Sequence, residues 1–200
     1  MTQVQPSFLG AAEETDAVRA LYDGDLAQDG FVMNLSRVWA HSPELKDRLA
    51  GLMVEAATAA GLTFRQRGVL VAATASTRGD SYCSLAWGTR LAGELGADAA
   101  AAVLRGDDSV LDPPERALAR WARQIARDPG GTGPGDVQAL RDAGFDDAQV
   151  LALTVYAACR IAFSTVNGAL GASPDAEYRE FAPAPVLAAV TYGRPVADRA

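Results

Sequence analysis

The chain has 200 residues, enough for one domain with its own core, and 49% of them are hydrophobic although only 7% are aromatic. Acidic and basic residues are interspersed and give a net charge of −7, so no basic stripe is available to neutralise phosphates, and nucleic-acid binding is not expected. With one His, one Lys and two Cys, the sequence offers no spacing of ligands for a zinc site and few residues for other nucleophilic chemistry.

The hydropathy pattern indicates a soluble protein. No apolar run approaches the roughly 20 residues that a membrane span requires, and residues 1–6 lack the charged and apolar regions of a signal peptide. We therefore expect a cytoplasmic protein that binds no membrane. A composition rich in alanine and poor in aromatic residues favours tightly packed helices over sheets.

Helical periodicity runs through most of the chain, and no segment shows the alternation of a strand. Residues 1–12 are predicted to form a loosely held N-terminal arm, residues 13–182 an all-α domain, and residues 183–200 a Pro-rich tail packed on that domain. Within the domain, the first helix is expected over residues 13–28 and a short second helix over residues 35–40.

The next two helices have clear start signals. Ser42 caps a helix that has Pro43 at its first position and Gly61 after its end. Its apolar residues recur at helical spacing and are predicted to face the core; they are Leu45, Leu49, Leu52, Met53, Ala56 and Ala60. Thr63 then caps a helix whose stretch Val69–Ala75 is apolar nearly all round, which predicts a buried central helix.

Asp80 is expected to cap a fifth helix that runs to about Glu94. Short helices are predicted over residues 98–105 and 136–143, with a Gly/Pro linker over residues 129–135 before the second of them. The helix ahead of that linker starts at a Pro-Pro pair, and its core-facing residues are Leu118, Trp121, Ala122 and Ile125.

A long last helix is predicted from Asp146 to Gly171. Both halves of the chain pass through a glycine turn, at Gly61 and Gly144, into a buried helix that ends in a Leu-Gly pair. This common order indicates a weak internal helical repeat.

The segment Gly79–Trp87 carries the residues most suited to chemistry. At about 100° per residue, one helical stripe contains Asp80, Cys83, Trp87, Arg90 and Glu94. A carboxylate, a thiol, an indole and a guanidinium could therefore line one surface. The alternative is that Trp87 faces the core and that Arg90 and Glu94 form a solvated pair.

The frame of this segment resembles the alkylhydroperoxidase (AhpD-like) and carboxymuconolactone decarboxylase superfamily, in its peroxidase-related branch. In that family a Glu stands twelve positions before a Cys-x-x-Cys motif, and a His follows four positions after the second Cys. The residues at those four positions here are Gly68, Asp80, Cys83 and Trp87, so the motif is degenerate.

The resemblance extends to other segments and covers roughly residues 29–171. Asp29–Leu45, Gly61–Arg67 and the stretch from Ala143 to Gly171 are similar to the corresponding parts of that branch. It implies an AhpD-like helical bundle, a homo-oligomer and peroxide reduction by a thiol. We expect no cofactor and no metal.

Cys83 is the third residue after the predicted cap, where helix-terminal amides would lower the pKa of a thiol. The carboxylate of Asp80 would oppose this effect. No obvious base is near in the sequence, and the family's redox disulfide cannot form because Asp80 and Ala86 lack sulfur. Cys159 is expected to be buried packing, and would resolve an oxidised Cys83 only if the fold brought the two close.

Three functions stay open. The first is an oxidoreductase in which Cys83 alone reduces a peroxide and is regenerated by an external thiol. The second is carboxymuconolactone decarboxylase-like acid/base chemistry on a small organic acid or lactone, with Asp80 as proton carrier and Tyr82 and Arg90 orienting the substrate. The third is a non-catalytic homologue that binds a small molecule.

The predicted substrate-binding residues are Tyr82, Trp87, Arg90 and Asn167. Simpler roles stand beside these: Asp80 could be a helix cap only, Tyr82 could be packing, and Asn167 could satisfy a helix-terminal carbonyl. His41 is expected to bond carbonyls at a helix end.

Many apolar stripes in a domain of this size cannot all face one core, which favours a homo-oligomer, a dimer or a higher cyclic assembly. The contact is expected to involve helices around the site and the tail from Ala182 to Pro195.

Overall fold

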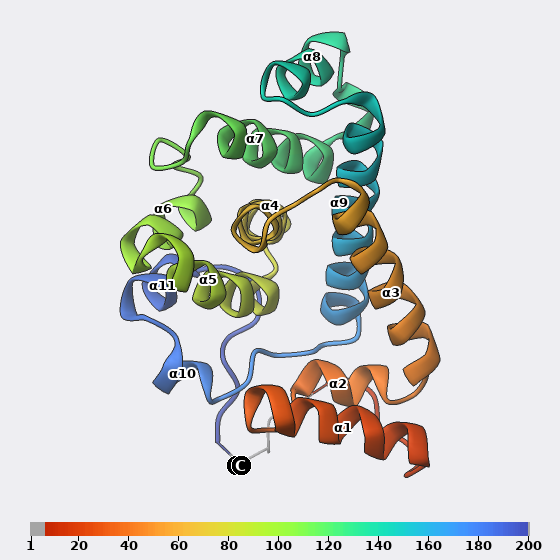
Figure 1. Ribbon diagram of the computed structural model, residues 1–200. Coiled ribbons are helices and arrows are strands. Elements are labelled where there is room, and N and C mark those ends of the chain that lie inside the picture. The colour runs from red at the N-terminus through yellow and green to blue at the C-terminus, as the bar shows by residue number, and fades with distance from the viewer. Residues whose placement is uncertain (1–6, 200) are drawn as a thin grey trace.

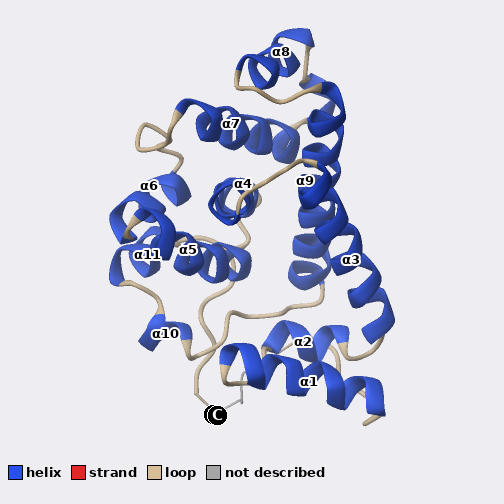
Figure 2. Cartoon of the chain, viewed as in Figure 1, coloured by secondary structure: helices blue, strands red, loops and turns tan. Residues whose placement is uncertain are grey.

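The computed structural model describes residues 7–199, and these residues form helices and loops without a strand (Figures 1 and 2). In chain order the elements are α1 (Asp16–Asp29), α2 (Asn34–Trp39), α3 (Pro43–Ala59), α4 (Phe64–Thr77), α5 (Ser81–Leu95), α6 (Ala97–Arg105), α7 (Pro113–Arg127), the 3-10 turn η1 (Pro129–Gly131), α8 (Pro134–Asp142), α9 (Asp147–Ala169), α10 (Tyr178–Phe181) and α11 (Ala184–Ala189). The all-α prediction is confirmed. The first half of the predicted N-terminal arm, residues 1–6, lies outside the described residues.

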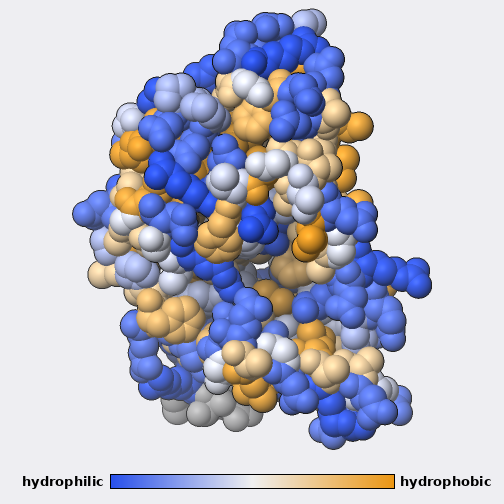
Figure 3. Space-filling view, viewed as in Figure 1, coloured by the Kyte–Doolittle hydropathy of each residue, from blue (hydrophilic) through white to orange (hydrophobic). Residues whose placement is uncertain are grey.

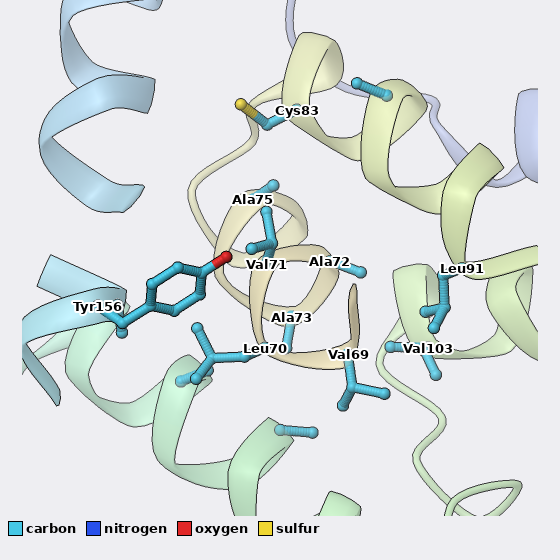
Figure 4. Packing of buried hydrophobic residues seen from close by; sticks show 14 of the residues in the cluster. Val69, Leu70, Val71, Ala72, Ala73, Ala75, Cys83, Leu91, Val103 and Tyr156 are labelled. Atoms are coloured by element: carbon cyan, nitrogen blue, oxygen red, sulfur yellow. The ribbon is translucent and has the colours of Figure 1, made fainter. Parts of the chain in front are cut away.

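Helix α4 occupies the centre of the bundle and is seen end-on in Figure 1, with α5, α6, α7 and α9 around it. Residues Val69–Ala75 are almost completely inaccessible to solvent, as the sequence predicted. Because most of these side chains are valine or alanine, the neighbouring helices can approach α4 closely on every side (Figure 4).

The helices start near the predicted positions, and the differences follow from local capping. Helix α1 begins at Asp16, not at residue 13, because the Thr15 hydroxyl caps it by accepting a hydrogen bond from the Val18 amide at 3.2 Å. Helix α8 begins at Pro134, because proline is well suited to the first position of a helix.

The predicted core face of α3 is partly wrong. Leu45 and Leu52 are 59% and 45% exposed, whereas Met53, Ala56 and Ala60 are buried. Helix α3 lies at the edge of the bundle and packs mainly on α9 (Figure 1). A helix with a single large neighbour buries only a narrow stripe, so the outer leucines stay in solvent.

The internal repeat is visible in the caps of α4 and α9. Gly61 and Gly144 both adopt positive φ, of 65° and 98°, two residues before the cap. Each cap, Thr63 and Asp146, forms a capping box with a glutamine three residues later. The two turns also touch, because the Gln149 side chain donates to the Ala60 carbonyl at 3.3 Å.

Among the described residues, α9 is long and apolar enough to cross a membrane by length and composition. The expectation that no stretch approaches that length is therefore wrong for this helix. It packs against α3, α4, α7 and α8, which is the setting of a core helix in a soluble protein. A cytoplasmic location stays a prediction.

The chain after α9 folds back over the start of α5. Helix α11 packs on α5 and α6, where a Cβ on Gly88 would lie 2.8 Å from the Leu104 side chain. Beyond α11, the Tyr192 hydroxyl donates to the Ser84 hydroxyl at 3.0 Å, and the Ser81 hydroxyl donates to the Arg194 carbonyl at 2.7 Å. These contacts place residues 190–194 against the α4–α5 turn.

Replacing Gly193 by alanine tests whether residues 190–194 are held against the α4–α5 turn. Its φ is +73°, and an added Cβ would lie 2.5 Å from the Gly79 carbonyl oxygen, so the tail would have to move. The control is Gly106→Ala, where φ is +88° but no atom lies within 4 Å, so only backbone strain is added. We expect the control to lower the free energy of unfolding by about 1 kcal/mol and Gly193→Ala by at least about 1 kcal/mol more, measured by urea denaturation. Equal losses would contradict the docking.

Candidate functional site

The turn from α4 into α5 positions the first site residues. Gly79 has a φ of +67°, and Asp80 follows it as the cap of α5, accepting a hydrogen bond from the Cys83 amide at 3.0 Å. The second carboxylate oxygen of Asp80 accepts a hydrogen bond from the Ser164 hydroxyl of α9. The predicted cap is therefore present, and it joins the two halves of the repeat.

Cys83 lies one turn into α5 and is only 3% exposed. Burial raises the pKa of its thiol, the carboxylate of Asp80 raises it further, and the guanidinium of Arg160 lowers it without offsetting the other two. Of the two opposing effects expected from the sequence, the raising of the pKa by Asp80 is present and the lowering by helix amides does not prevail, because burial removes the sulfur from water and the amide of Cys83 is bonded to Asp80.

Arg160, on α9, is the residue that sequence reasoning missed. Its Nη2 lies 3.5 Å from the Cys83 sulfur, and its Nη1 lies 3.8 Å from the Met53 sulfur. The guanidinium stacks over the rings of Trp87 and Phe163, at 5.3 and 5.2 Å from their centroids. The signal available in the sequence was a single arginine within the apolar run of the last long helix.

Arg160 is 8% exposed and has no carboxylate partner within ion-pair distance among the described residues. Its Nε is buried and has no hydrogen-bond acceptor. Burying a cation without a counter-charge is costly. Among the described residues, the ionisable group within hydrogen-bond distance of this guanidinium is the Cys83 thiol.

The residues of the predicted stripe on α5 do not all face the same neighbours. Trp87 is half-buried and lies between the guanidiniums of Arg160 and Arg90, at 5.3 and 5.8 Å. Arg90 instead pairs with Asp29 at 3.2 Å, so the Arg90–Glu94 pair does not form. The structure thus brings together Asp80, Cys83 and Trp87, and directs Arg90 toward α1.

Helix α4 has no acidic residue, and Gly68 lets it pack closely on α5. A Cβ added at this position would lie 3.0 Å from the Cδ1 atom of Leu91. Leu91 is completely buried, and it would have to shift by a few tenths of an ångström to admit even a methyl group.

Tyr82 is buried, and its hydroxyl donates to the carboxylate of Asp175 while accepting from the Leu35 amide at 3.4 Å. Asp175 also accepts from the Asn34 amide at 2.7 Å. This network ties α5 to α2 and to the segment after α9. A buried hydroxyl that both donates and accepts within this network does not favour substrate contact by Tyr82.

The remaining predicted residues lie away from Cys83 or serve packing. The Asn167 carbonyl oxygen accepts from the Trp39 indole at 2.9 Å and does not satisfy a helix-terminal carbonyl. Cys159 and Cys83 are both free and buried, so they form no disulfide. His41 is exposed, with a ring nitrogen 3.1 Å from the Gly10 carbonyl oxygen, as expected for a helix-end residue.

A pocket of about 400 Å³ opens beside the cap of α5. Its lining comes from the α4–α5 turn, the end of α9 and the tail, and consists of Arg78, Gly79, Asp80, Ser81, Ser164, Thr165, Gly168, Ala169, Ala172, Gly193 and Arg194. Asp80 and Ser164 face this pocket, whereas Cys83 is not part of its lining. The site therefore has two sides, an open one at Asp80 and a buried one at Cys83 and Arg160.

No protein-family model and no curated protein matches this sequence. Solved structures do match. An uncharacterized peroxidase-related protein from Ralstonia eutropha JMP134, described as an alkylhydroperoxidase AhpD core, is 23% identical with a TM-score of 0.75, over 86% of this chain and 94% of that one. Another uncharacterized peroxidase-related protein, from Silicibacter sp. TM1040, is 18% identical with a TM-score of 0.77, over 90% and 97%.

A third structure is the debrominase Bmp8 in complex with 2,3,4-tribromopyrrole, solved as a cysteine-to-alanine variant. It is 14% identical with a TM-score of 0.64, over 90% of this chain and 94% of that one. At these identities the likeness establishes the fold. The AhpD-like, peroxidase-related resemblance is thus confirmed as a fold.

The buried carboxyl of Asp175 should make the stability of the folded protein depend on pH. Burial raises its pKa from 3.8 to about 6, so between these values the folded state retains a proton that the unfolded state has released. Its contribution to stability is therefore full below about pH 4 and is lost as the pH rises to about 6, by up to roughly 3 kcal/mol. We expect Asp175→Asn to reduce this slope in urea denaturation, leaving the part that comes from Asp25, whose pKa burial also raises, and Asp23→Asn, at an exposed position, to retain the full slope. An unchanged slope in Asp175→Asn would contradict the assignment.

Proposed function

We propose that this protein is a thiol-dependent oxidoreductase in which Cys83 reduces a small peroxide and Arg160 stabilises the thiolate. The observation that carries the proposal is the 3.5 Å contact between Nη2 of Arg160 and the Cys83 sulfur. Because Arg160 has no carboxylate partner among the described residues, the thiolate would be its counter-charge. The AhpD-like, peroxidase-related fold supports the same reaction class.

The chemistry requires one thiol on the protein and thiols from outside. The Cys83 sulfur attacks one peroxide oxygen, the O–O bond breaks, and the released alkoxide takes a proton and leaves as an alcohol. The resulting sulfenic acid condenses with a small external thiol to give a mixed disulfide and water. A second external thiol then releases Cys83 and departs as a disulfide.

Arg160 can serve this step because a guanidinium remains charged and carries five donors. One edge holds the sulfur as its negative charge develops. Burial nevertheless keeps the pKa of Cys83 raised, so only a small fraction of the thiol is ionised at neutral pH. The proposed enzyme is therefore slow at neutral pH and faster in alkaline solution.

A second candidate function is acid/base chemistry at Asp80, which the open pocket favours. Ser164 donates to the Asp80 carboxylate, and Arg78 and Arg194 lie on the same pocket wall, where they could attract an organic acid. Tyr82 and Arg90, which the sequence assigned to this role, are engaged with Asp175 and Asp29. If this function holds, turnover of a small lactone or acid survives Cys83→Ala and is lost in Asp80→Asn.

The substrate screen should include halogenated aromatic compounds. The debrominase with this fold was solved with a brominated pyrrole. Trp87 and Phe163 flank Arg160 here, and flat apolar compounds suit contact with two such rings.

The thiol proposal predicts how labelling depends on pH and on two neighbours. After treatment with an alkyl hydroperoxide, a sulfenic-acid probe should label Cys83, and the rate should rise about tenfold per pH unit from about pH 7 to 9, because the pKa is raised and the thiolate fraction grows. Arg160→Gln should slow labelling at neutral pH by about tenfold or more, since the counter-charge is lost.

Cys159→Ala is the matched control and should leave the labelling unchanged, whereas Cys83→Ala should abolish it. Mass spectrometry locates the adduct. A folded protein whose Cys83 stays unlabelled at every pH, with no peroxide turnover, contradicts the proposal.

We also propose a homo-oligomer, but its contact surface differs from the one that the sequence predicted. The apolar residues of the tail, such as Val186 and Ala189, are buried against the chain's own α5 and α6. The largest group of exposed large apolar residues on neighbouring helices lies on α3 and the adjoining α9; its members are Leu45, Leu52, Val54 and Leu151.

Light scattering across micromolar dilution tests the assembly. The mass should be a multiple of 20.9 kDa, and Leu52→Lys should lower it because a charge would be buried at the contact. Glu55→Lys, at a neighbouring exposed position outside the apolar set, is the control. A monomer mass at all concentrations refutes the oligomer.

A further inference from the structure

Arg160 has donor capacity that the thiol does not use. In a guanidinium, Nε–H and one N–H of Nη2 point from the same edge and match the two oxygens of a carboxylate. Nη2 contacts the Cys83 sulfur, while Nε is buried without an acceptor. An oxygen bound at Nε would therefore lie beside the sulfur.

A second guanidinium lies in the same region. Arg67, on α4, stacks on Phe64 at 5.5 Å, and Phe64 contacts Trp87 with 6.0 Å between ring centroids. Trp87 in turn stacks with Arg160. The Nε of Arg67 is also buried without an acceptor, and Arg67 has no ion-pair partner within the part of the chain that the structure describes.

Tyr156 is influenced by both guanidiniums and by the thiol. The charges of Arg160, Arg67 and Cys83 all act on the pKa of its phenol, which burial raises overall. The Tyr156 ring and the Cys83 sulfur both lie in the space between α9 and the pair of helices α4 and α5 (Figure 4). The two cations and the thiol thus belong to one region of the fold.

The two guanidiniums have donors that the protein leaves unpaired. The carboxylate of Asp80, which lies beside Cys83, is bonded to Ser164 and to the Cys83 amide, and within the described residues it forms no ion pair with either arginine. Each buried Nε–H therefore lacks an acceptor, which is costly in an apolar surrounding. The neighbouring side chains are aromatic, which suits a flat or apolar body on the group that supplies the missing acceptor.

The aromatic side chains beside the two guanidiniums reach solvent. Phe64 is 42% exposed and Trp87 is half-buried, so a small molecule could approach past these two rings. The face in Figure 3 is hollowed near its middle, between α5 on one side and α3 with α9 on the other.

We infer that Arg160 and Arg67 form a binding site for a small aromatic or apolar carboxylate, and that the substrate of Cys83 carries such a group. The second part rests on the proposed thiol function; the binding site does not. Nε of Arg160 receives one carboxylate oxygen next to the sulfur, and Arg67 supplies the second positive charge.

The binding experiment uses the full chain with benzoate as the probe and benzamide as its neutral isostere. By isothermal titration we expect benzamide to bind at least about tenfold more weakly than benzoate, because the amide lacks the charge. Benzoate should bind Cys83→Ala as tightly as the wild type. Equal affinity for the two probes, or no binding of benzoate, overturns the site.

Variants assign the binding to the two arginines. Arg67→Gln, at a half-buried position, and Arg160→Lys, which retains charge but loses the Nε edge, should each weaken benzoate binding by about tenfold. Arg141→Gln, on the surface of α8, is the matched control and should have no effect. If the control weakens binding as much as the other two, or if Arg67→Gln and Arg160→Lys both bind like the wild type, the inference is wrong.

A protection measurement separates this inference from the proposed function. Benzoate should slow alkylation of Cys83 by a small neutral reagent in proportion to its occupancy, and should not slow alkylation of Cys159. If the sulfenic-acid probe labels Cys83 after peroxide treatment but benzoate does not bind, the thiol function stands and the carboxylate site is refuted. Benzoate binding and protection without peroxide labelling would retain the site and refute the peroxidase.

Discussion

The burial of α4 is the constraint on which the rest of the structure depends. Its stretch Val69–Ala75 is inaccessible to solvent and consists mostly of small side chains, so other helices must cover every side of it. One of these helices is α5, entered through Gly79 at positive φ, and another is α9. The site forms where α5 and α9 pass each other on the surface of this central helix.

The meeting of α5 and α9 sets the electrostatics of Cys83. Asp80 raises the pKa of the thiol and Arg160 lowers it, while burial outweighs both. The two charged groups approach from different halves of the internal repeat. The open pocket lies on the Asp80 side and the buried cation on the other, so the accessible carboxylate and the buried thiol face different surroundings.

Gly68 and Trp87 acquire a physical meaning in the fold. Gly68 faces Leu91 at close range, and Trp87 covers the guanidinium of Arg160. The two positions thus serve packing and a cation–π contact. The cation that Trp87 covers lies beside the Cys83 sulfur, where it can hold a negative charge.

The sequence by itself determined the helices, the caps and the buried centre, because helical periodicity, Thr63, Asp80 and Asp146 act over a few residues of chain. It also placed Asp80 and Cys83 one turn apart. Only the tertiary structure decided what faces them: Arg160 is 77 residues from Cys83 in the chain, and Asp175 is 93 from Tyr82. The pKa of the thiol and the partner of each buried charge depend on such distant neighbours and on exclusion of water, which local spacing does not encode.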